Sequence, residues 1–241
     1  MYMLYVLALL LGVIHVSHGT GCNGVAADFV FVMDGSDGVT DLGFAKQKFF
    51  VSGLIENFDV NPNSSNIGIL AYGSQVGGDT LGLQPFKGKT QIKEHIMSME
   101  YPKGDTNIAV GIDDAREMLK QQGRPTAAKY MVVFTDKLSS SPMHTYTQAF
   151  LAKADGIKIF AVGMGPDSSN EEMKMLASGP NDMFAIPDIA SLDALSPYLS
   201  DQLCKGYMNA YADMQQHGPG HLAGRRDNST STQPKYNNMQ P

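Results

Sequence analysis

The chain has 241 residues and a formal net charge of −6, and 43% of its residues are hydrophobic. This apolar content can form a sizeable core, which excludes a wholly disordered chain. The acidic balance argues against a nucleic-acid-binding surface, because such surfaces need clustered lysine and arginine. Two cysteines are too few for a disulfide-dense fold or a cysteine-based zinc finger. We expect one domain with short extensions.

The first segment, residues 1–19, is predicted to be a secretory signal peptide. It carries no Asp, Glu, Lys or Arg, contains an apolar run that reaches Val16, and ends with small residues at Ser17 and Gly19. The run is short for a hydrocarbon core roughly 30 Å thick. We therefore expect a protein that is secreted to the extracellular space and is not inserted in a membrane.

Secretion changes the interpretation of the two cysteines. In an oxidising compartment, the simplest expectation is one disulfide between Cys22 and Cys204, which would join the two ends of a single domain. Pairing with a second molecule is the alternative. Asn63 and Asn228 begin the sequons Asn-Ser-Ser and Asn-Ser-Thr, so both are candidate glycosylation sites.

Six apolar runs have the length of strands, and three of them are nearly continuous, which is typical of strands buried on both faces. In chain order, the runs are Phe29–Met33, Ile67–Tyr72, Thr80–Pro85, Tyr130–Phe134, Ile157–Val162 and Met183–Ile186. The run Thr80–Pro85 is the weakest of them.

Helical spacing occupies most of the gaps between these runs. The predicted helices contain Phe50, Leu54 and Phe58; then Ile108, Ile112 and Met118; then the segment Met143–Asp155; and finally the stripe from Ile189 to Leu203. Strands that alternate with helices indicate crossover connections. We predict an α/β fold with three layers and a doubly wound, mainly parallel, six-stranded sheet. Residues 205–241 are rich in Gly, Gln, Asn, Ser and Pro, and we expect them to form a flexible polar tail.

Polar side chains follow the expected strands where a ligand would bind. In an open parallel sheet, this position is beyond the carboxyl ends of the strands, at the switch point of the topology. Asp34 and Ser36 follow the first strand, Thr106 opens a helix, and Asp136 follows the strand Tyr130–Phe134. These hard oxygen ligands, with no Cys or His among them, suit Mg²⁺ (or Ca²⁺ or Mn²⁺) rather than zinc.

The same residues carry a resemblance to a known family. Three segments match it: the strand from Phe29 to Asp34 running into Asp-x-Ser-x, the loop Gly104-Asp105-Thr106-Asn107, and Val133-Phe134-Thr135-Asp136. In order and spacing they resemble the von Willebrand factor type A domain of integrin I domains, matrilins and type VI collagen. The resemblance covers about Ala26 to Cys204, and we take the domain as residues 22–204. It implies a metal-ion-dependent adhesion site at Asp34, Ser36, Thr106 and Asp136.

Two positions depart from the family pattern. Gly38 stands where the pattern Asp-x-Ser-x-Ser has its second serine, and Lys137 follows Asp136 where the family commonly has glycine. Glycine supplies no side-chain oxygen, and the lysine ammonium could compete with a nearby cation. Two alternatives therefore stay open: a working ion site, or a degenerate site on an intact scaffold.

The sequence leaves two functions to compare. The first is a secreted, non-enzymatic adhesion protein that binds an extracellular matrix protein such as collagen through this site. The second is a structural component of an extracellular material, such as a byssal or shell matrix, that needs no functional ion site. A hydrolase or dehydrogenase has little support, because the chain lacks a Gly-x-Ser-x-Gly elbow and its first strand is followed by no Gly-x-Gly-x-x-Gly motif.

Overall fold

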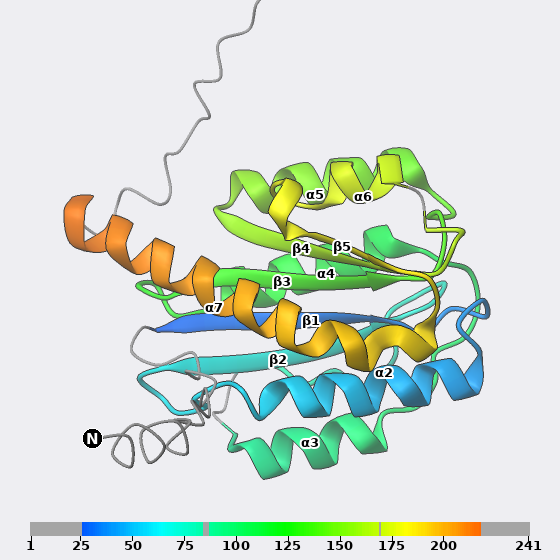
Figure 1. Ribbon diagram of the computed structural model, residues 1–241, viewed down its shortest axis with the longest axis horizontal. Helices are drawn as coiled ribbons and strands as arrows, with labels where there is room; N and C mark the ends of the chain where they lie inside the picture. The colour runs from blue at the N-terminus through cyan, green and yellow to red at the C-terminus, as the bar shows by residue number, and fades with distance from the viewer. Residues whose placement is uncertain (1–25, 84–86, 169, 218–241) are drawn as a thin grey trace, which may run out of the picture.

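The computed structural model describes residues 26–83, 87–168 and 170–217. The predicted signal peptide, Cys22 and Asn228 lie outside these ranges. In the described part, five strands form one fully parallel sheet in the order β2-β1-β3-β4-β5 (Figure 1). The strands are β1 (Ala27–Asp34), β2 (Ser65–Tyr72), β3 (Ala128–Thr135), β4 (Ile157–Met164) and β5 (Met183–Ile186).

Helices cover both faces of this sheet, which gives the predicted three layers (Figure 1). One face is covered by α2 (Thr40–Ile55), α3 (Lys89–Ser98) and α7 (Leu192–His217). The other face is covered by α4 (Ile108–Gln121), α5 (Pro142–Ala154) and α6 (Asn170–Leu176). Short 3₁₀ turns, Pro180–Asp182 and Ile189–Ser191, flank β5. The α/β doubly wound prediction is confirmed.

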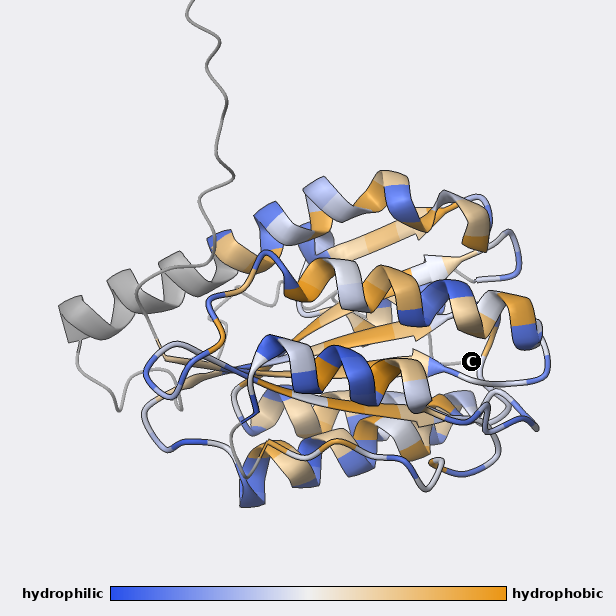
Figure 2. Cartoon of the chain, turned by 90° about the horizontal axis from the view of Figure 1, so that it is seen from below, coloured by the Kyte–Doolittle hydropathy of each residue, from blue (hydrophilic) through white to orange (hydrophobic). Residues whose placement is uncertain are grey.

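The core is divided by the sheet into two clusters, because successive residues of a strand point to opposite faces. Phe29 and Phe31 of β1 face the α2 side, whereas Val30 and Val32 face the α4 side. All eight residues of β1 are buried, as expected for the central strand of a doubly covered sheet. The hydrophobic colouring of the strands and the mixed colouring of the helices in Figure 2 show the same arrangement.

The predicted strand Thr80–Pro85 is wrong within the described residues, which place no sixth strand in the sheet. Leu81 forms an isolated antiparallel bridge with Ile69, through two backbone hydrogen bonds of 2.8 Å. Two residues further on, the backbone N–H of Leu83 donates to the side-chain Oε1 of Gln122 at 2.9 Å. A side chain therefore replaces the neighbouring strand that a ladder would need.

Two helix boundaries also differ from the predictions. α2 ends at Ile55, and Phe58 follows it as a buried residue that contacts Phe29 edge-on at 4.8 Å. α7 continues past Cys204 to His217, so helix extends into the segment predicted as a flexible tail. This extension is rich in Ala, Met and Gln, which favour helix, and Pro219 lies beyond it. No helix in the described ranges combines the length and apolar content needed to cross a bilayer.

Candidate functional site

The carboxyl ends of β1 and β3 meet at the switch point of the sheet, since β1 lies between β2 and β3. The structure brings the four predicted residues together there, and we call Asp34, Ser36, Thr106 and Asp136 the rim site. Asp34 is the last residue of β1, and Asp136 directly follows β3. Thr106 precedes α4 in the loop that runs from α3.

Asp34 is the central residue of the rim site. It is fully buried, and each of its carboxylate oxygens accepts a backbone hydrogen bond. The N–H of Ser36 donates to Oδ1 at 2.9 Å, and the N–H of Asp136 donates to Oδ2 at 3.0 Å. One carboxylate therefore ties the loop after β1 to the loop after β3.

Two hydroxyl groups complete the buried part of the site. Thr106 Oγ1 donates to Ser36 Oγ at 3.0 Å, and both residues are almost completely buried. Backbone hydrogen bonds join the two loops, from the Asp37 N–H to the Gly104 carbonyl at 2.9 Å and from the Lys103 N–H to the Gly35 carbonyl at 2.8 Å. The left-handed backbone at Gly104, with φ of 92°, suits glycine and allows this close approach.

Asp136 is half-buried and has an unpartnered oxygen. Its Oδ1 is buried and accepts no hydrogen bond from the described residues. A buried acceptor without a donor is costly, and a cation would compensate for it. Burial first, and the negative charge of Asp34 second, raise the pKa of Asp136 to about 7. Burial also raises the pKa of Asp34, although the backbone N–H groups of Ser36 and Asp136 oppose this shift.

Three further residues support the rim, and the sequence patterns did not identify them. The Gln47 side chain binds the backbone of Asp34 from both sides: its Oε1 accepts from the N–H at 3.1 Å and its Nε2 donates to the carbonyl at 2.6 Å. Tyr101 donates its hydroxyl to the Ser36 carbonyl at 2.6 Å, and Tyr72 donates its own to the Phe134 carbonyl at 2.8 Å. A faint signal existed for Gln47, because it interrupts the apolar stripe of its helix between Phe44 and Val51.

The oxygen set fits a hard dication in part. Two hydroxyls and two carboxylates converge, and one carboxylate oxygen lacks a donor, which suits Mg²⁺, Ca²⁺ or Mn²⁺. The fit is incomplete because Gly38 contributes no side-chain oxygen. The described residues contain no group of three or more His, Cys, Asp or Glu side chains that could hold a metal ion, so hydroxyls would have to be part of the ligand set.

The other predicted sites lie apart from the rim. Asn63 is exposed in the turn before β2, a position accessible to a glycan. Cys204 packs against the core from α7, while its predicted partner Cys22 and the second sequon at Asn228 lie outside the described residues. The disulfide and both glycans stay predictions.

Comparison with known proteins decides the family. The sequence pattern of the von Willebrand factor type A domain matches residues 28–197, which include the whole rim site. The chain belongs to this family. Mouse matrilin-2 is 31% identical over 192 residues, covering 76% of this chain and 20% of matrilin-2. The mouse collagen alpha-5(VI) chain is 31% identical over 176 residues, covering 71% of this chain and 6% of that protein.

A solved structure shares the fold of this von Willebrand factor type A domain. Proximal thread matrix protein 1 (PTMP1) from the mussel byssus, solved with a zinc-occupied MIDAS motif, aligns with a TM-score of 0.69 and 25% identity. The alignment covers 75% of this chain and 48% of PTMP1. The chain therefore spans a minority of each of these relatives.

Proposed function

We propose that this protein is a secreted, non-enzymatic adhesion protein of the extracellular matrix that binds a collagen-like matrix protein through its rim site. The convergence of two carboxylates and two hydroxyls at the switch point carries this proposal. Membership of the von Willebrand factor type A family and the likeness to matrilin-2 and a collagen chain support the matrix role. The apolar segment 1–19 supports secretion.

The residues that would hold Mg²⁺ (or Ca²⁺ or Mn²⁺) are the hydroxyls of Ser36 and Thr106 and the carboxylates of Asp34 and Asp136. A bound dication would supply positive charge for a carboxylate of the partner. The protein's own residues fix the direction of that contact, because the hydrogen bonds on Asp34 join the loops after β1 and β3, and the Thr106 hydroxyl joins the third loop to Ser36. This arrangement needs no group that reacts, which agrees with a binding role.

A solid-phase assay on immobilised fibrillar collagen tests this function. We expect the full secreted chain to bind in Mg²⁺ and to lose most binding in EDTA or with Asp136→Ala. Asp201→Ala is the matched control, because Asp201 is an exposed carboxylate on α7 that pairs with Lys205. Binding that survives both EDTA and Asp136→Ala would contradict a role for the ion site.

A structural role in an extracellular material is the second candidate. The fold shared with a byssal thread matrix protein favours a place in such a material, and the missing oxygen at Gly38 favours a scaffold that needs no ion. In that case the scaffold would assemble without an ion at the rim. Recovery of the protein from an insoluble, decalcified extract would support this candidate, whereas a freely soluble protein in body fluid would count against it.

A further inference from the structure

Gly38 faces the charged groups of the loop after β3. A Cβ atom built on Gly38 would lie 2.2 Å from Asp136 Oδ2 and 2.8 Å from Lys137 Nζ. Both distances are shorter than real Cβ contacts, so any side chain at position 38 would displace the carboxylate, the ammonium, or both. The two departures from the family pattern therefore occupy one region of space.

The turn that carries Lys137 is held in position. The Asp136 N–H donates to Asp34 Oδ2 at 3.0 Å, and Thr135 Oγ1 donates to the Lys137 carbonyl at 2.7 Å. Lys137 is half-buried, and its positive charge acts on the Asp136 carboxylate, where it opposes the effects of burial and of Asp34. The Lys137 ammonium thus lies near the Asp136 carboxylate without forming an ion pair with it, so its positive charge acts where a dication would bind.

We propose that the Lys137 ammonium is an internal cation of the rim site, which means that it occupies space left by the missing side chain of Gly38 and competes with divalent ions for Asp136. This regulation rests on the proposed function, because it concerns the same site. The family pattern has room for a serine hydroxyl at position 38, whereas this chain has an ammonium next to that position. The consequence is weak divalent binding in the native chain, which removing the Lys137 charge would strengthen.

Calorimetric titration of Mg²⁺ and of Mn²⁺ into the full secreted chain, with no partner present, tests this proposal. We expect Lys137→Met to tighten the dissociation constant at least about tenfold. Gly38→Ser alone should tighten it less than Lys137→Met does, because the Lys137 ammonium is still present beside the added hydroxyl. The double variant should bind most tightly. Lys129→Met is the control, since it removes the same charge from a half-buried position at the start of β3, at the opposite end of that strand from Asp136.

A dissociation constant for Lys137→Met within twofold of the native value would overturn the proposal. So would a Gly38→Ser variant that binds as tightly as the double variant. A second readout needs no metal: in EDTA at pH 8, Lys137→Met should lower the Tm more than Lys129→Met does, and an equal Tm would contradict an internal cation. A negative result for Lys137 would not contradict the adhesive function, because the loss of collagen binding expected for Asp136→Ala does not depend on Lys137.

Discussion

Asp136 links the chemistry of the rim to the stability of the fold. Its pKa is raised to about 7, from 3.8 in an unfolded chain, because it is partly buried near Asp34. The folded state therefore binds more protons than the unfolded state between these values. This contribution to stability is complete below pH 3.8 and is lost as the pH rises toward 7.

We predict that Asp136→Asn reverses this loss in metal-free protein. In EDTA, the variant should gain about 1–2 kcal/mol over the native chain at pH 8 and much less at pH 4, after allowance for solvent screening of a half-buried group. Urea unfolding at the two pH values measures the difference. Asp201→Asn, on an exposed carboxylate, should show no such pH-dependent gain. Parallel pH profiles for the native chain and Asp136→Asn would refute the prediction.

Gln47 is a second residue whose role can be measured. Gln47→Leu would leave the buried N–H and carbonyl of Asp34 without the partners they now have. We expect the free energy of unfolding to fall by about 1–3 kcal/mol. Gln121→Leu is the matched control, because Gln121 is exposed on α4 and bonds a neighbouring carboxylate, Glu117. Equal effects of the two substitutions, measured by chemical denaturation, would contradict this account.

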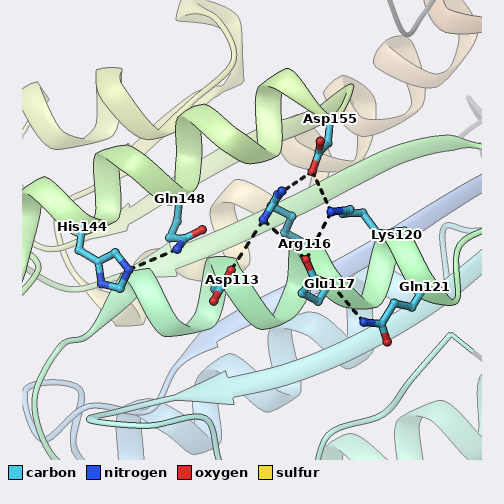
Figure 3. A network of polar contacts seen from close by, with 8 residues as sticks. All are labelled: Asp113, Arg116, Glu117, Lys120, Gln121, His144, Gln148 and Asp155. Atoms are coloured by element: carbon cyan, nitrogen blue, oxygen red, sulfur yellow. Dashed lines mark hydrogen bonds and ion pairs between the residues drawn. The ribbon is translucent and has the colours of Figure 1, made fainter.

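At the scale of the elements, α4 and α5 are joined by a polar network (Figure 3). Arg116 Nε donates to Asp155 Oδ2 at 2.6 Å, and the Arg116 side chain is 15% exposed. Lys120 reaches the same carboxylate oxygen at 3.8 Å. Because the arginine is mostly buried, this contact should contribute more than an ordinary surface ion pair.

We predict that Arg116→Met lowers the free energy of unfolding by about 1 kcal/mol at low salt. The loss should shrink at about 1 M salt, where the screening length falls to about 3 Å. Lys174→Met, which removes an exposed pair with Glu171, should change stability by much less. An Arg116→Met effect that is the same at both salt concentrations would rule out an electrostatic origin. Chemical denaturation at both salt concentrations measures these differences.

The strands β1 to β4 could be predicted from the sequence because they are buried on both faces. Apolar runs located all five, and β5 matches its predicted range, Met183–Ile186, although its residues are half-buried or exposed. The helices α3 and α6 were missed. In α3 the buried residues are Ile92 and Ile96, which is too narrow a stripe to recognise among polar neighbours. α6 is a short helix, Asn170–Leu176.

The rim site could be located because strand ends in a parallel sheet share one edge. The supporting contacts could not, because they depend on distances between side chains far apart in the sequence. The Tyr101 hydroxyl reaches the Ser36 carbonyl, and Gln47 reaches the Asp34 backbone. Likewise, the sequence showed Gly38 and Lys137 as separate departures, whereas the coordinates show that they are neighbours in space.

For the whole molecule, a single-chain sheet with helices on both faces presents the ends of its central strands as one binding edge (Figure 1). The rim loops are tied to each other and to α2, so they form a prepared surface rather than one that must be ordered on binding. In the proposed function, the cost of ordering these loops on binding would therefore be small.

The most direct test is anomalous diffraction from crystals of the secreted chain grown with Mn²⁺ in large excess. The account predicts one strong manganese peak bounded by the Ser36 and Thr106 hydroxyls and the Asp34 and Asp136 carboxylates, with higher occupancy in Lys137→Met crystals. Manganese bound at other positions, with no density between these four side chains in either crystal, would contradict it.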